Sequence, residues 1–207
     1  MDNLIKRSIW LYFLLLVGEG ALRKWILPGL SDAILIIRDP LVLIIYALAL
    51  TSGRFPMRTA VFVVGIMAIL SVVFAAIAGS PVLVTIYGLR INYLHLPLIF
   101  IMADVLDRDD VLSFGRAVLW LTLPIGLLMI LQYLAGTQSF LNVGAGGDLG
   151  GQLEGAMGKI RPPGPFSFIS GPVLWFSLAT AYAIYGWTHR NLCSRWLLTL
   201  VTCMIVI

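Results

Sequence analysis

The feature that most constrains the fold is a succession of long apolar runs separated by short polar segments. A helix of about 17–25 apolar residues spans the hydrocarbon core of a bilayer. Backbone amides cannot stay unpaired in lipid, and no run has the two-residue alternation of a barrel strand, so each run is expected to be helical. We predict an all-α polytopic transmembrane bundle forming a single domain, residues 1–207, with about seven spans. The predicted spans are 8–27, 33–51, 60–79, 84–104, 117–135, 167–187 and 194–207.

Composition supports lipid as the solvent of this chain. Apolar residues make up 60% and charged residues 12%, against about 45–50% and about 25% in ordinary soluble domains. The net charge of +4 comes from scattered basic residues, which argues against a nucleic-acid partner. Cys193 and Cys203 form no metal-ligand pattern and are interpreted as packing residues, so they predict no metal site. The last apolar run reaches Ile207 without a polar exit, so the chain is expected to be the N-terminal part of a longer protein.

Basic residues in the short connections set the orientation. With a cytoplasmic N-terminus, each of the four inside segments carries two of them, as the positive-inside rule requires. These eight residues are Lys6, Arg7, Arg54, Arg58, Arg108, Arg116, Arg190 and Arg195.

The other six cations all fall, in this orientation, in the outer half of the membrane or at its outer surface. Cations at mid-helix cost about 2.5–3.5 kcal/mol each on insertion scales. Snorkelling and local pairing, as between Arg38 and Asp39 or Glu19 and Arg23, would account for single residues. A binding site for an anionic ligand accounts for all six together, and Arg23, Arg38, Arg90 and Arg161 are predicted to converge on one outward cavity. The six cations are Arg23, Lys24, Arg38, Arg90, Lys159 and Arg161.

The longest connection, 136–166, is predicted to be extracytoplasmic. Its glycine-rich stretch 144–151 is interpreted as a flexible flap or as a slack linker. It ends in a proline-rich segment that leads into the sixth span, which holds Arg161 at a helix N-terminus. There the cation and the helix dipole would both face an anion.

This segment resembles a known family. Arg161-x-x-Gly164-x-Phe166, entering a helix after an outer loop, is similar to the core entry of the O-antigen ligase and O-antigen polymerase superfamily. In that family an Asn-x-Asn or related polar run usually follows, whereas 167–171 here reads Ser-Phe-Ile-Ser-Gly. Glu19-Gly-Ala-Leu-Arg-Lys-Trp-Ile-Leu-Pro28, with Arg38-Asp39-Pro40 behind it, is similar to a bacterial branch of these proteins.

The resemblance implies glycan transfer at the outer face of the bacterial inner membrane. The donor would be a saccharide on undecaprenyl pyrophosphate, the acceptor a glycan or lipid, and no cofactor would be needed. Negative charge develops on the departing pyrophosphate, which arginine stabilises through its planar fork. Arg161 is the expected catalytic residue, and activity is expected only from the full-length protein, with its later outer loop. The expected substrate-binding residues are Arg23, Lys24, Arg38, Arg90 and Lys159.

Two other function classes stay open. A polytopic lipid or oligosaccharide transporter would also use buried cations, although no internal repeat of the span pattern is seen. The second open class is a non-catalytic subunit of a polysaccharide assembly complex. For His95, packing or hydrogen bonding is favoured over catalysis, and His189 is interpreted as a solvated loop residue. Asp104, Asp107, Asp109 and Asp110 are interpreted as a solvated loop and helix N-cap.

Overall fold

The computed structural model describes residues 1–149, 158–189 and 192–206. All of the longer regular elements in these ranges are helices and none is a strand, which confirms the all-α prediction. Within the described residues, four helical stretches are long and apolar enough to cross a membrane: Pro28–Thr51, Thr59–Ile77, Val82–Val105 and Arg108–Leu134. The total of seven spans stays a prediction. Arg190, Ile207 and the loop residues 150–157, with Glu154, lie outside the described ranges.

Several helices extend beyond the apolar runs that predicted them. Helix α1 (Asp2–Ala21) begins before the first run, and α7 (Arg108–Leu134) begins well before residue 117. Asp109 and Asp110 lie in the first turn of α7, where a negative charge interacts favourably with the helix dipole. An apolar run marks the part of a helix that suits lipid, whereas the helix itself continues into polar turns.

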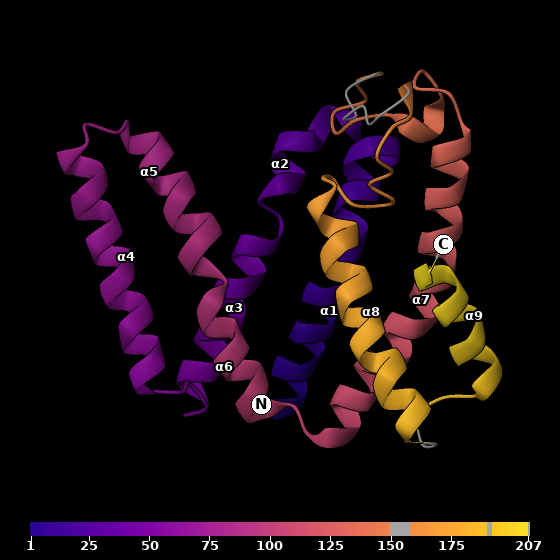
Figure 1. Cartoon of the computed structure of the whole chain (residues 1–207). Coiled ribbons are helices and arrows are strands. Elements are labelled where there is room, and N and C mark those ends of the chain that lie inside the picture. Colours follow the sequence, from indigo (N-terminus) through magenta and orange to yellow (C-terminus); the bar gives the residue numbers. More distant parts are fainter. Residues whose placement is uncertain (150–157, 190–191, 207) are drawn as a thin grey trace. The chain divides into compact units, whose positions relative to one another are not determined.

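The chain forms two compact units (Figure 1). Unit 1 comprises Met1–Phe13 and Ile37–Asp107, and unit 2 comprises Leu14–Ile36 and Arg108–Ile207. Each unit therefore takes part of α1.

Unit 1 contains the start of α1 and three further helical stretches. These are α3 (Arg38–Thr51), α4 (Thr59–Ile77) and a stretch made of α5 (Val82–Leu89), η3 (Arg90–Leu94) and α6 (Leu96–Val105). Helix α4 has no buried residue, as expected of a helix whose apolar side chains face lipid. The core of the unit consists of Ile5, Ile9, Val42, Ile45, Ala49, Leu98, Ile101 and neighbouring apolar residues.

Ion pairs join the helix ends and connections at one end of unit 1. Lys6 Nζ lies 2.8 Å from Asp107 Oδ2, and Arg54 Nη2 lies 2.7 Å from Asp2 Oδ2. Arg58 pairs with Asp104, which lies in α6 and not in a loop as predicted. The N-terminus, the α3–α4 connection and the end of α6 therefore meet at the same end of this unit, as successive crossings of a membrane require.

Unit 2 is built on three packed helices. Helices α7, α8 (Ser170–Thr188) and α9 (Arg195–Val206) contact one another. A Cβ on Gly115 would lie 2.5 Å from the Tyr182 ring, so only glycine allows α7 and α8 to approach this closely. The buried core between the helices consists of Leu119, Ala183, Leu192, Leu197, Leu198 and Val201.

Shorter elements of unit 2 lie at the end where α8 begins (Figure 1). They are the end of α1, the π-helical η1 (Leu22–Ile26), η2 (Pro28–Leu30), α2 (Ser31–Leu35) and η4 (Phe140–Asn142). They surround the segment that connects the loop to α8, and so they position the candidate site.

Reporter fusions test the predicted orientation. Two basic residues in each inside segment predict that fusions after Ser52 and after Asp107 report the cytoplasm. A fusion at Gly147 is expected to report the outside, and alkaline phosphatase paired with green fluorescent protein gives both readings. A cytoplasmic signal at Gly147 would overturn the orientation and with it the outer cation layer.

Candidate functional site

The segment that carries Arg161 is fixed through the backbone of Gly164. The amide of Gly164 donates to Gln132 Oε1 at 2.8 Å, and its carbonyl accepts from Lys24 Nζ at 3.1 Å. Gly164 has a φ of +59°, a conformation that favours glycine. Gln132 and Lys24 are 0% and 1% exposed, so both contacts are closed to water. The turn of the Arg-x-x-Gly-x-Phe element is thus held from two helices, α7 and η1.

Arg23 fixes the same segment one turn further along. Its Nε donates to the carbonyl and hydroxyl oxygens of Ser31 at 3.0 and 3.1 Å, and its Nη1 donates to Ser167 Oγ at 2.9 Å. Glu19 Oε1 lies 3.7 Å from Nη1, and both side chains are buried. The π-helical turn at 22–26 brings consecutive cations, Arg23 and Lys24, into contact with one loop. These two cations therefore act as positioning residues for the loop.

Gly20 allows the helix to lie directly against this loop. A Cβ built on Gly20 would lie 2.5 Å from backbone atoms of Phe166 and Ser167, and closer still to the Pro165 carbonyl oxygen. Backbone atoms cannot move aside as a flexible side chain can. The glycine in the Glu19–Pro28 motif is thus explained by close packing of helix against loop.

Substitution of Gly20 by alanine is expected to separate the loop from α1. Overpacking of this kind costs about 1–3 kcal/mol, so the unfolding midpoint of the purified protein should fall by several degrees. Gly18→Ala is the matched control, because a Cβ there would meet nothing within 4 Å. Equal midpoints for the two variants in a thermal unfolding assay would contradict the packing described above.

An open pocket of about 830 Å³ lies beside this loop, between α7 and the start of α8. Lys159 and Arg161 contribute its charges, and Lys159 Nζ lies 5.3 Å from the centre of the Tyr133 ring. Arg161 is exposed and makes no hydrogen bond or ion pair with any residue that the structure describes. The apolar part of the wall includes Met129, Tyr133, Ile169, Pro172, Val173 and Leu174.

A second pocket of about 550 Å³ shares part of this wall. It has Met129, Tyr133 and Pro162 in common with the first and continues to Phe176 on α8 and Met204 on α9. Its lining carries no charged residue. The two pockets together offer two cations at one end and an apolar surface along the helices. Such a surface fits an amphiphile with an anionic head.

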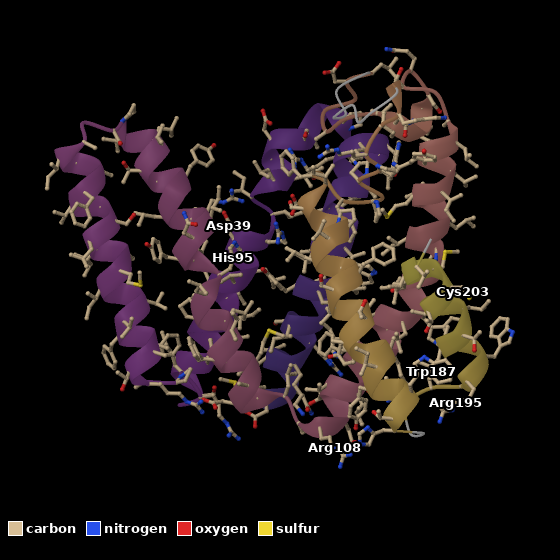
Figure 2. All side chains as sticks on the ribbon, viewed as in Figure 1. Asp39, His95, Arg108, Trp187, Arg195 and Cys203 are labelled. Atoms are coloured by element: carbon tan, nitrogen blue, oxygen red, sulfur yellow. The ribbon has the colours of Figure 1, made fainter. Side chains whose placement is uncertain are left out.

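The two remaining candidate cations belong to unit 1. Arg90 Nε pairs with Asp39 Oδ2, and the Arg38 guanidinium lies 5.9 Å from the centre of the Tyr12 ring. Asp39, at the start of α3, also lies 3.4 Å from His95 Nε2 (Figure 2). Pairing of Asp39 with its neighbour Arg38 was considered as an alternative. The partners of Asp39 in the structure, Arg90 and His95, come from a different helical stretch.

The six predicted cations thus fall into three groups with different environments. Lys159 and Arg161 line the pocket, whereas Arg23 and Lys24 hold the adjoining loop and do not line it. Arg38 and Arg90 belong to the other unit, and their convergence with Arg161 stays a prediction. The described part of the glycine-rich stretch contacts η1, since Gly146 N donates to the Arg23 carbonyl at 3.1 Å.

Sequence reasoning missed residues that hold the site together. Gln132 carries the one side-chain amide in the predicted span 117–135, and this amide bonds the backbone of both Gly164 and Leu141. An isolated amide in an apolar run is a sign of an internal partner, because lipid offers none. The isolated amide of Gln132 was therefore a readable sign of a contact inside the protein, and the contact is with the loop. Tyr12 gave no comparable signal, and Asp39 was considered only as a partner of Arg38.

Comparisons of the chain with protein-family models, with curated proteins and with solved structures find no match. The resemblance to the O-antigen ligase and polymerase superfamily therefore stays a prediction from the residues themselves. The fold and site geometry described above stand independently of it.

Proposed function

We propose that this protein is a bacterial inner-membrane glycan polymerase or ligase. It transfers a saccharide from undecaprenyl pyrophosphate to a glycan or lipid acceptor at the periplasmic face. The observation that carries the proposal is the pocket at the loop–α8 junction, where Lys159 and Arg161 stand at the end of an apolar groove. A polyprenyl pyrophosphate has the matching chemistry, an anionic head on a long hydrocarbon chain.

The roles of the residues follow from the reaction. As the acceptor hydroxyl attacks the anomeric carbon, the bond to pyrophosphate breaks and negative charge grows on the departing oxygen. Arg161, held by a fixed loop, stabilises that charge more in the transition state than in the bound donor. Lys159 binds the head as a point charge. Arg23, Lys24 and Gln132 keep the loop in place, so that little reorganisation is needed during the reaction.

Binding of lipids by the purified protein tests the pocket. We expect undecaprenyl pyrophosphate in nanodiscs to bind more tightly than undecaprenol, which lacks the anion, and than inorganic pyrophosphate, which lacks the chain. Arg161→Gln is expected to remove most of the difference between undecaprenyl pyrophosphate and undecaprenol. Val173→Trp, which fills the apolar wall, is expected to weaken binding of both lipids.

The matched control is Val63→Trp on α4, an exposed position of unit 1 outside the pocket. It is expected to bind all three ligands as the unchanged protein does. Equal affinity for undecaprenyl pyrophosphate and undecaprenol in the unchanged protein would contradict the proposal, because an apolar groove without an anion site binds both.

A further inference from the structure

Unit 1 contains a second polar cluster inside an otherwise apolar helix assembly. The hydroxyl of Tyr12, on α1, lies 3.2 Å from Nδ1 of His95. Nε2 of the same ring lies 3.4 Å from Oδ1 of Asp39, whose other oxygen pairs with Arg90. The side chains of Asp39 and Arg90 are 13% and 15% exposed, and that of His95 is 24% exposed. A phenol, an imidazole and a carboxylate therefore lie in a row.

The order of the groups determines the tautomer of His95. An ionised carboxylate only accepts hydrogen bonds, so Asp39, which pairs with Arg90, needs a donor on the ring atom that faces it. The neutral His95 ring therefore carries its proton on Nε2. Nδ1 then has a free lone pair and accepts from the Tyr12 hydroxyl. This is the arrangement of a base held by a carboxylate and hydrogen-bonded to a hydroxyl group.

One atom in the cluster has unused hydrogen-bonding capacity. Asp39 Oδ1 is fully buried and makes no hydrogen bond of good geometry to any residue in the described ranges. The nearest donor is His95 Nε2 at 3.4 Å. A buried carboxylate oxygen without a hydrogen bond is costly, and an N–H donor on the neighbouring ring would compensate it. Asp39 Oδ1 is therefore placed to accept a hydrogen bond from His95 Nε2 in either charge state of the ring.

Titratable and charged groups reach His95 from three elements packed in this unit. Helix α1 contributes Tyr12. Helix α3 contributes Arg38, Asp39 and Tyr46, whose hydroxyl donates to the Leu94 carbonyl at 2.6 Å. The ring's own stretch contributes Arg90. Helix α4, which also packs on this stretch, carries no titratable side chain. One carboxylate thus faces two guanidinium groups and one imidazole.

We propose that Tyr12, His95 and Asp39 form a proton-transfer site, in which His95 accepts a proton at Nδ1. The proton leaves the Tyr12 oxygen as the bond to Nδ1 forms, and Tyr12 regains a proton from water. The net change is one proton moved from water to the imidazole, with no electron transferred. The imidazolium donates from Nε2 to Asp39 Oδ1 and from Nδ1 to Tyr12, so the Tyr12–His95 hydrogen bond reverses its direction. The site is independent of the proposed glycan transfer, and intramembrane ionisable rows of this kind are used as proton relays.

The chain allows a direct measurement, because it has only two histidines. His189 is exposed and outside this unit, so His189→Gln leaves His95 as the single imidazole. Long-range nitrogen–proton NMR of this variant, labelled with ¹⁵N-histidine, reports the tautomer and the charge of the ring during a pH titration. We expect the Nε2–H tautomer at high pH and uptake of one proton by the ring as the pH is lowered.

Two substitutions separate a proton site from a merely structural ring. Asp39→Asn is expected to lower the proton-binding constant of His95 about tenfold or more, since it removes the opposite charge. Tyr12→Phe keeps the carboxylate and is expected to leave the Nε2–H tautomer in place while slowing proton exchange at Nδ1. A ring that stays in one charge state throughout the titration, or that carries its proton on Nδ1 at high pH, would overturn the proposal. The tautomer is measured with the cluster intact, so it does not depend on whether the Asp39 variant folds.

Discussion

The proposed function predicts that substitution of Arg161 by lysine removes most glycan transfer, although the charge is kept. Arginine offers a planar pair of donors to a pyrophosphate, and lysine offers a single point charge. Loss of one such stabilising donor costs about 10²–10³ in rate, or roughly 3–4 kcal/mol. The measurement is glycan extension or transfer in a strain that lacks the native enzyme, with protein level determined in parallel.

The amount of Arg161→Lys protein in the membrane is expected to match that of the unchanged protein. Arg161 is exposed and has no hydrogen-bond or ion-pair partner within the described part of the chain, so folding does not rely on it. Arg58→Lys is the control substitution, since it keeps the ion pair with Asp104 at the end of unit 1. Normal product lengths from a well-expressed Arg161→Ala variant would show that Arg161 has no catalytic role.

Substitution of Arg23 by alanine is expected to have the largest effect on stability. The change removes three hydrogen bonds and leaves Glu19 buried without the guanidinium at 3.7 Å. Loss of one partner from a buried ion pair typically costs about 3–5 kcal/mol. The unfolding midpoint of the purified protein should fall by more than in Gly20→Ala, and binding of undecaprenyl pyrophosphate should weaken as the loop loosens.

Two comparisons isolate the cause of that loss. Arg7→Ala, at an exposed position of α1, is expected to change stability by less than about 0.5 kcal/mol. The double variant Glu19→Ala and Arg23→Ala is expected to be more stable than the sum of the two single losses predicts, because the interaction between the two side chains is lost only once. Strict additivity would contradict a direct interaction between Glu19 and Arg23.

The helical class was predictable from the sequence, whereas the geometry around the candidate site was not. Apolar runs predict helices because lipid leaves the backbone no other way to satisfy its hydrogen bonds. The same runs do not show where a helix begins. Helix α7 illustrates this, because its first turns are polar and precede the apolar run. Lys159 and Arg161 were predicted from their place at a loop–helix junction, and both line the pocket.

The contacts of Arg23 and Lys24 were not readable from the sequence. Both were predicted to bind substrate, since an unpaired cation in the membrane needs an anion. The structure shows other acceptors for them, namely the carbonyl of Gly164 and the hydroxyl of Ser167. These acceptors lie more than a hundred residues away in the chain, and backbone carbonyls leave no trace in the amino-acid pattern. The close packing of Gly20 against the loop could not be predicted for the same reason, because Gly20 contacts backbone atoms.

The measurement that tests the proposed function most directly follows the donor lipid. The purified protein in nanodiscs receives an oligosaccharide on undecaprenyl pyrophosphate, together with an acceptor glycan and a metal chelator. We predict that transfer to the acceptor releases undecaprenyl pyrophosphate in equal amount, and that Arg161→Lys releases it about 10²–10³ times more slowly. An active preparation that moves the intact donor lipid across the membrane, without cleaving it, would contradict the proposal and establish transport instead.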